Sequence, residues 1–173
     1  RVEYGETKKV WESLFSETEK PQAIYVNRDY EPYAKERDET ILALAKTHHC
    51  DFLSFKDQCI FEMDEVTKDD GLPYTVYTPY SKKWLEAFEI NGIQCFPSEE
   101  NLTKCIKTDT NKLPTLAEIG FKKSSIKVAS YKVTSKLIDT YEETRNFPAK
   151  NSTSRLGTHL RFGTVSVRKM VEK

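Results

Sequence analysis

The chain has 173 residues, of which 38% are hydrophobic and 31% charged, with nine Phe, nine Tyr and two Trp. This length suits one domain, or one domain joined to part of another. No apolar run approaches the roughly 20 residues of a membrane-spanning helix, and no secretory signal peptide is recognisable. A membrane span is therefore excluded, and a cytoplasmic location is expected.

The net charge of zero conceals two segments of opposite charge. Residues 121–173 hold 12 of the 27 basic side chains but only 4 of the 27 acidic ones. A basic segment of this kind is a candidate for contacts with phosphate groups. Mutual attraction between the two segments explains the same distribution at least as well, so charge alone does not decide.

The first part of the chain alternates between strand and helix patterns. Apolar residues at helical spacing predict a helix over 8–16, and the continuous apolar run 23–26 predicts a buried strand. Pro32 suits the first position of a second helix, and 51–55 predicts a second short strand. Residues 59–61 are either a third strand or an irregular loop. This alternation predicts a parallel sheet with crossover helices.

A further helix is predicted after the turn at residues 69–73. Thr78 is its expected N-cap and Pro79 its first residue. Its expected buried side consists of Trp84, Leu85 and Phe88.

Residues 96–125 are rich in Pro, Ser, Thr and Asn and show little periodicity, so they predict a linker between domains. After it, apolar spacing predicts a helix over 130–144, and 165–173 predicts the first turns of another helix.

Two short clusters contain residue types that bind ligands. The run His48-His49-Cys50 is interpreted as a helix end, because sequence neighbours on a helix point in different directions and no second ligand pair is evident. No metal site is predicted. Segment 151–157 (NSTSRLG) combines hydroxyls, an arginine and a helix start, which makes it a candidate phosphate site. An ordinary N-cap with surface charge explains the pattern of 151–157 more simply.

Four segments together resemble the DNA photolyase/cryptochrome family, in its class I cyclobutane pyrimidine dimer photolyase-like form. Segments 141–148 (YEETRNFP) and 152–168 are similar to the start of the family's flavin-binding domain. Segments 27–38 and 71–84 are similar to two parts of its N-terminal α/β domain. All four occur in the family's order, which makes the set far more specific than any single match.

The resemblance implies an α/β fold with a Rossmann-like parallel sheet and flanking helices over 1–95, lacking its first strand. A linker over 96–125 and the first helices of the all-α FAD-binding domain over 126–173 would follow. The chain begins with Arg1 rather than Met, and we expect it to be a fragment of a longer protein.

The resemblance also implies roles for individual residues. Those expected to bind FAD, chiefly on its phosphate and ribitol side, are Tyr141, Thr153, Ser154, Arg155, Leu156 and Gly157. Arg145 matches a position that faces the DNA backbone, where it would act by charge and not by reading bases. The family often has Ser at the position of Gly157, so a hydroxyl donor is missing there while the backbone N–H is retained.

An antenna chromophore is a further expectation from the family. Relatives that bind folate use a polar residue and a carboxylate at the positions of Tyr33 and Ala34, so folate binding by these two residues is not supported. A deazaflavin, a flavin or no antenna stay open.

The resemblance implies a blue-light-driven DNA repair enzyme that acts on UV-damaged DNA, in which electron transfer from reduced FAD splits a cyclobutane pyrimidine dimer. No obligate protein partner is evident. Only Trp11 and Trp84 are present, and no catalytic residue is assigned within the chain. The 173 residues alone are therefore expected to be inactive and to bind FAD weakly or not at all. The alternatives are a cryptochrome photoreceptor, a (6-4) photolyase and an unrelated nucleotide-binding module.

Overall fold

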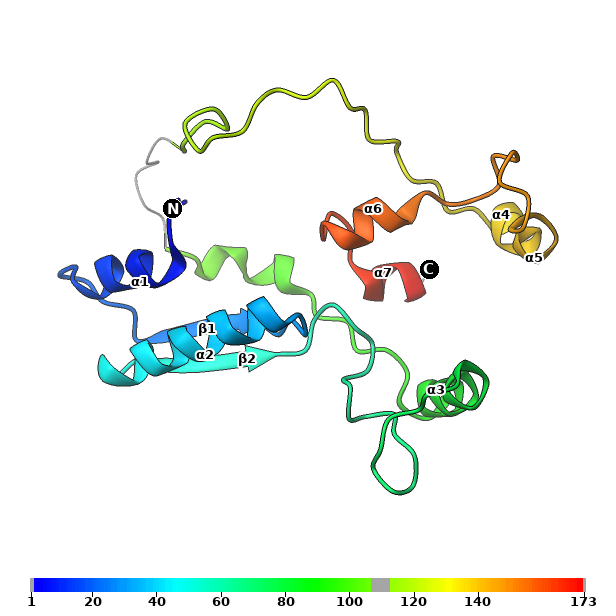
Figure 1. Ribbon diagram of the computed structural model, residues 1–173, viewed down its shortest axis with the longest axis horizontal. Coiled ribbons are helices and arrows are strands. Elements are labelled where there is room, and N and C mark those ends of the chain that lie inside the picture. The colour runs from blue at the N-terminus through cyan, green and yellow to red at the C-terminus, as the bar shows by residue number, and fades with distance from the viewer. Residues whose placement is uncertain (1, 107–112, 173) are drawn as a thin grey trace. The chain divides into compact units, whose positions relative to one another are not determined.

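The computed structural model describes residues 2–106 and 113–172. The chain divides into two compact units, residues 1–123 and 124–173 (Figure 1). The domain limits expected from the sequence stay a prediction, and residues 107–112 of the expected linker lie outside the described residues.

A two-stranded parallel sheet organises the first unit. Strand β1 (Ala23–Asn27) pairs in parallel with β2 (Asp51–Phe55), each residue of β1 lying opposite one of β2. Helix α2 (Pro32–Thr47) connects the strands and lies along them, and α1 (Thr7–Phe15) precedes β1 (Figure 1). The parallel α/β arrangement predicted from the alternating pattern is confirmed.

A small apolar core lies between the two helices and the sheet. It consists of Phe15, Ile24, Ile41, Ala45 and Cys50. The Phe15 ring is 1% exposed and stacks on His48, with 4.4 Å between ring centroids. His48 is the C-cap of α2 and His49 has a left-handed backbone with φ of 55°, so these histidines mark a helix end, as interpreted.

The region between β2 and the second unit differs in part from the prediction. Residues 59–61 form an irregular loop, and a 3₁₀ helix, η1 (Ser98–Lys104), lies within the expected linker. Helix α3 (Tyr77–Asn91) begins one residue before Thr78 and has no side-chain cap, so the prediction that Thr78 is the N-cap is wrong. Pro79 takes the third helical position instead, which suits it because the first N–H groups of a helix have no partner within it.

An aromatic cluster covers only part of the expected buried side of α3. Trp84 stacks on Phe88 and meets Phe61 edge-on, with both centroid distances 5.3 Å. Leu85 is 56% exposed, so its predicted burial is wrong. Residues 84 and 88 share one helix face, whereas residue 85 lies about a quarter turn away from it.

The described residues of the second unit form four short helices. They are α4 (Ser135–Asp139), α5 (Tyr141–Thr144), α6 (Leu156–Arg161) and α7 (Val167–Glu172). The prediction of a single helix over 130–144 is wrong in two respects. The helix begins only at Ser135, after the Lys132 N–H has bonded to the Ser154 carbonyl and Thr134 has capped α4, and Thr140 divides it into α4 and α5. No described residue of this unit is buried.

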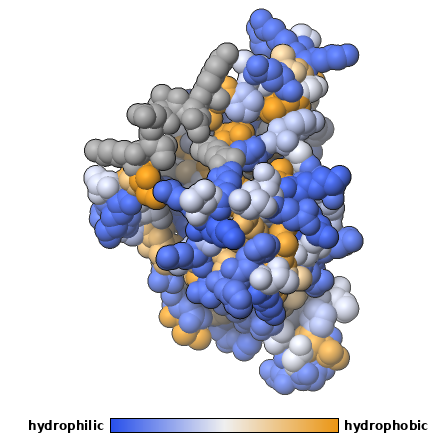
Figure 2. Space-filling view, turned by 90° about the vertical axis from the view of Figure 1, so that its left-hand side faces the viewer, coloured by the Kyte–Doolittle hydropathy of each residue, from blue (hydrophilic) through white to orange (hydrophobic). Residues whose placement is uncertain are grey.

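Large apolar side chains are exposed in both units. On the face that Figure 2 shows, orange apolar areas lie among polar residues. On the sheet, Tyr25 and Phe55 stack at 6.0 Å and are 68% and 48% exposed. No helix among the described residues has the length and apolar character to cross a bilayer.

Candidate cofactor and DNA-contact site

Helix α5 presents an aromatic ring and a cation on the same face. Tyr141 is the first residue of α5 and Arg145 its C-cap, one helical turn later. The Arg145 guanidinium lies 6.0 Å from the centroid of the Tyr141 ring, which is within the range of a cation–π contact. Residues four positions apart on a helix lie on the same face, which explains this contact.

The segment before α6 has an unusual backbone at Arg155. This residue is the N-cap of α6 and has φ of 56° and ψ of 25°, which is the left-handed region. An arginine in this region costs about 1 kcal/mol relative to its preferred conformations. One Arg155 Nη2 hydrogen bond to Asn151 Oδ1, 3.0 Å long, supports the conformation.

The other predicted FAD residues surround this turn. The Ser154 hydroxyl accepts a hydrogen bond from the Leu156 N–H at 3.4 Å, and Leu156 begins α6. Thr153 is exposed immediately before them. At Gly157, a Cβ atom would find no heavy atom within 4 Å, so the position has room for a side chain.

One contact connects the two parts of the predicted site. The Ser152 hydroxyl donates to the Thr144 carbonyl at 3.4 Å, which joins the segment before α6 to the end of α5. Among the described residues, no hydrogen bond or ring contact joins Tyr141 to residues 153–157. The structure therefore brings residues 153–157 together and leaves Tyr141 linked to them only through α5.

The charge of this region is positive and poorly neutralised. The partner of Arg155 is a neutral amide, and Arg145 and Lys150 each lie over an aromatic ring. Within the described part of the chain, no carboxylate lies within ion-pair distance of these three cations. Guanidinium, hydroxyl and backbone N–H donors are the set that suits a phosphate group, so the residues present fit the diphosphate of a dinucleotide.

His159 is a residue of this region that the sequence analysis did not select. Its Nε2 lies 3.0 Å from the Ala129 carbonyl oxygen and its Nδ1 lies 2.9 Å from the Thr164 hydroxyl. The Tyr131 ring meets it edge-on at 5.0 Å. The partners at 129 and 131 are about 30 residues away in sequence, so no local pattern could have revealed the contact.

A polar cluster lies at the carboxyl ends of the two strands. Arg28 donates to Glu62 through Nε and Nη2 at 3.1 and 2.9 Å, and to the Ser54 carbonyl at 3.0 Å. The Tyr30 hydroxyl donates to the other Glu62 oxygen at 2.6 Å. Burial alone would raise the pKa of Glu62, but the hydrogen bonds from Tyr30 and Arg28 and the charge of Arg28 outweigh it and lower that pKa. Burial and the bond to Glu62 raise the pKa of Tyr30, so it stays a neutral donor.

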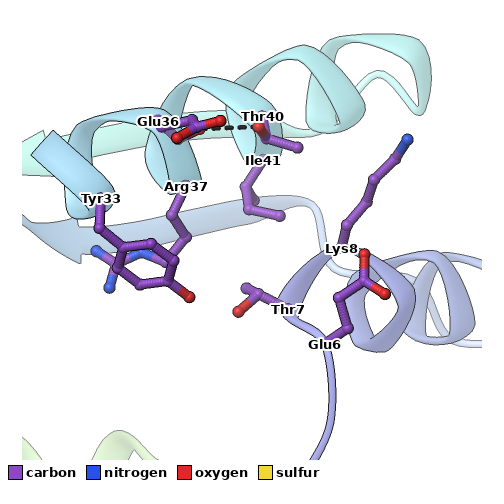
Figure 3. A pocket seen from close by; sticks show the side chains of 8 residues that line it. All are labelled: Glu6, Thr7, Lys8, Tyr33, Glu36, Arg37, Thr40 and Ile41. Atoms are coloured by element: carbon purple, nitrogen blue, oxygen red, sulfur yellow. Dashed lines mark hydrogen bonds between the residues drawn. The ribbon is translucent and has the colours of Figure 1, made fainter.

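A surface hollow of about 200 Å³ lies between α1 and the first half of α2. Tyr33 and Arg37 of α2 project into it toward Thr7 of α1 (Figure 3). Ala34 is 4% exposed and belongs to the interior. The hollow is smaller than the roughly 300–1,000 Å³ of typical ligand pockets, so these residues alone do not enclose an antenna chromophore.

Similarity to known proteins extends over almost the whole chain. A family model described as DNA photolyase matches residues 1–100. The deoxyribodipyrimidine photo-lyase of Synechococcus sp. is 29% identical over 85% of the chain and 34% of its own length. That of Halobacterium salinarum is 27% identical over 99% of the chain and 38% of its own length.

A solved structure gives the same result for the fold. The crystal structure of a bacterial class III photolyase from Agrobacterium tumefaciens matches with a TM-score of 0.69 and 25% identity. The match covers 94% of this chain and 36% of that protein. The chain thus spans little more than a third of these relatives, and since the family model matches more than half of its residues, it belongs to the DNA photolyase family.

Proposed function

We propose that the full-length protein is a deoxyribodipyrimidine photolyase that splits cyclobutane pyrimidine dimers in DNA under blue light. In this proposal the chain supplies part of the α/β domain and the start of the FAD-binding domain. The observation that carries the proposal is the family match over 1–100, together with a named photo-lyase that aligns with 99% of the chain and so includes segment 141–157.

Residues 153–157 would hold the phosphate and ribitol side of FAD. Arg155 would donate from its guanidinium, Thr153 and Ser154 from their hydroxyls, and Gly157 from its backbone N–H. The Leu156 N–H would donate as well, in exchange for its 3.4 Å hydrogen bond to the Ser154 hydroxyl. Tyr141 would contact the same cofactor from α5. The chemistry that reduced FAD supplies when bound is electron donation to the pyrimidine dimer after absorption of blue light.

Arg145 would contact the DNA backbone. The Tyr141 ring is its only partner among the contacts of the described residues, so the guanidinium is available to a phosphate oxygen. Contacts of this kind position a protein on DNA without reading the sequence, and they weaken as salt concentration rises.

Two single variants of the full-length protein test the division of roles. Arg155→Ala is expected to lower FAD retention about tenfold or more, because it removes charged hydrogen bonds to phosphate. Arg145→Ala is expected to retain FAD and to lower affinity for damaged DNA about fivefold or more, with a smaller salt dependence. The two measurements are flavin absorbance per protein after gel filtration and DNA affinity at two salt concentrations.

The activity itself is tested by repair of a thymine dimer under blue light. A full-length protein that is purified without flavin would contradict the proposal. A flavin-containing protein that repairs only (6-4) photoproducts, or neither lesion, would assign it instead to the (6-4) photolyases or the cryptochromes.

A further inference from the structure

We propose that His159 is a positioning residue of the FAD site. It attaches the extended segment 129–132 to α6. This segment then keeps residues 153–157 in their phosphate-binding conformation. The inference rests on the proposed FAD site, and it adds a residue whose partners lie outside the segment expected to bind the cofactor.

The hydrogen bonds of the His159 ring fix its tautomer. The Ala129 carbonyl oxygen can only accept a hydrogen bond, so Nε2, 3.0 Å away, carries the proton. In the neutral ring, Nδ1 can then only accept, and the Thr164 hydroxyl is the donor beside it, 2.9 Å from Nδ1 and 3.3 Å from the His159 carbonyl oxygen. The Thr164 N–H also donates to the His159 carbonyl at 3.0 Å, so both nitrogens and the backbone of His159 have partners.

The segment that His159 fastens reaches the turn directly. Two residues after Ala129, the Tyr131 ring packs edge-on against the imidazole with 5.0 Å between centroids. The next residue, Lys132, donates its backbone N–H to the Ser154 carbonyl at 2.9 Å. Segment 129–132 is therefore attached to α6 at one end and to the residue before Arg155 at the other.

This attachment explains how Arg155 keeps an unfavourable backbone. A non-glycine residue with φ of 56° needs support on both sides of the turn. Lys132 holds Ser154 on one side, and His159 holds α6 on the other. Release of either contact would let the Arg155 backbone relax and would spread the phosphate donors over several conformations.

The ring geometry provides a matched pair of variants. A glutamine side chain places its amide nitrogen near the position of Nε2, and an asparagine places its amide near that of Nδ1. His159→Gln therefore retains a donor for Ala129, whereas His159→Asn retains only the local contact with Thr164. His159→Ala removes both.

The experiment uses the full-length protein with these three variants, checked for unchanged overall helicity by circular dichroism. One measurement is hydrogen–deuterium exchange of the Lys132 amide, and the other is FAD retention. We expect His159→Asn and His159→Ala to speed exchange and to weaken FAD retention, each about two- to tenfold, while His159→Gln stays within about twofold of the wild type.

Two outcomes would overturn the positioning role. The first is equal behaviour of the Gln and Asn variants, and the second is faster exchange at Lys132 with unchanged FAD retention. If the wild-type protein carries no flavin, the proposed function fails, and the exchange rates at Lys132 still decide whether His159 fastens the segment.

Discussion

At the scale of single residues, Arg155 and Gly157 are placed against their usual preferences. Arg155 adopts the left-handed conformation that usually favours glycine, while Gly157 lies in the first turn of α6 with open space around it. A glycine at 155 would relieve the backbone but remove the guanidinium. Residues with a strained backbone cluster at functional sites, and this observation supports a chemical role for the Arg155 side chain.

Replacement of Gly157 by Ser is expected to strengthen FAD binding in the full-length protein. A serine fits without collision and adds one donor, for a gain of about two- to tenfold in affinity. Flavin titration measures the gain. Gly157→Ala is the control, because alanine also improves helix propensity but adds no donor. Equal gains in the two variants would mean that the hydroxyl makes no contact.

Glu62 is expected to make stability depend on pH. Its folded pKa is lowered, so it contributes stability above its unfolded value of 4.5, and this contribution is lost as pH falls through the folded pKa. Glu62→Gln should lower the free energy of unfolding by about 1–2 kcal/mol near neutral pH, with a smaller loss in acid. Denaturant unfolding at several pH values measures both.

The exposed pair Lys83–Glu86 provides the control for this measurement. Both side chains are about half exposed, and the Nζ–Oε2 distance is 3.0 Å. Glu86→Gln should leave the free energy of unfolding almost unchanged, because water screens an exposed ion pair. A loss of unfolding free energy as large as that of Glu62→Gln would mean that the cluster at the strand ends stabilises the fold no more than an exposed ion pair does.

At the scale of elements, the stability of the α/β unit depends on α1 as well as on the sheet. Phe15 at the end of α1 is the largest fully buried side chain among the described residues. Phe15→Ala should lower the free energy of unfolding by about 3–5 kcal/mol, because it leaves a cavity beneath His48. Leu85→Ala on the exposed side of α3 should cost less than about 1 kcal/mol. Chemical denaturation distinguishes the two.

The elements that the sequence predicted correctly are those defined by local patterns. Strands β1 and β2 appear in the sequence as short apolar runs, and α2 appears as apolar residues at helical spacing. Both patterns arise because these elements bury one or both of their faces. The start of α4 could not be predicted in this way, because the Lys132–Ser154 bond keeps 129–132 extended despite its helical spacing.

The candidate site, too, has one part that local patterns predict and another that depends on distant contacts. Segment 151–157 is visible in the sequence, since its hydroxyls and arginine are contiguous. The role of His159 depends on contacts with residues about 30 positions earlier, which only the folded chain brings together.

At the scale of the whole molecule, the second unit has, over residues 124–172, no interior that could enclose a cofactor. None of its described residues is buried, and the chain aligns with only 34% of the length of the Synechococcus sp. photo-lyase. The 173 residues alone are therefore expected to lose FAD on gel filtration, whereas the full-length protein retains it. Stoichiometric flavin in the eluted 173-residue chain would contradict this expectation.

The sheet of the first unit has a consequence for production of the polypeptide. Among the described residues the sheet has two strands, so each strand has one edge with no neighbouring strand, and the exposed rings of Tyr25 and Phe55 stack on its surface. Exposed sheet edges of this kind can pair with strands of other copies of the chain. The 173 residues produced alone should therefore self-associate as their concentration rises, and light scattering of the gel-filtered chain at several concentrations measures this.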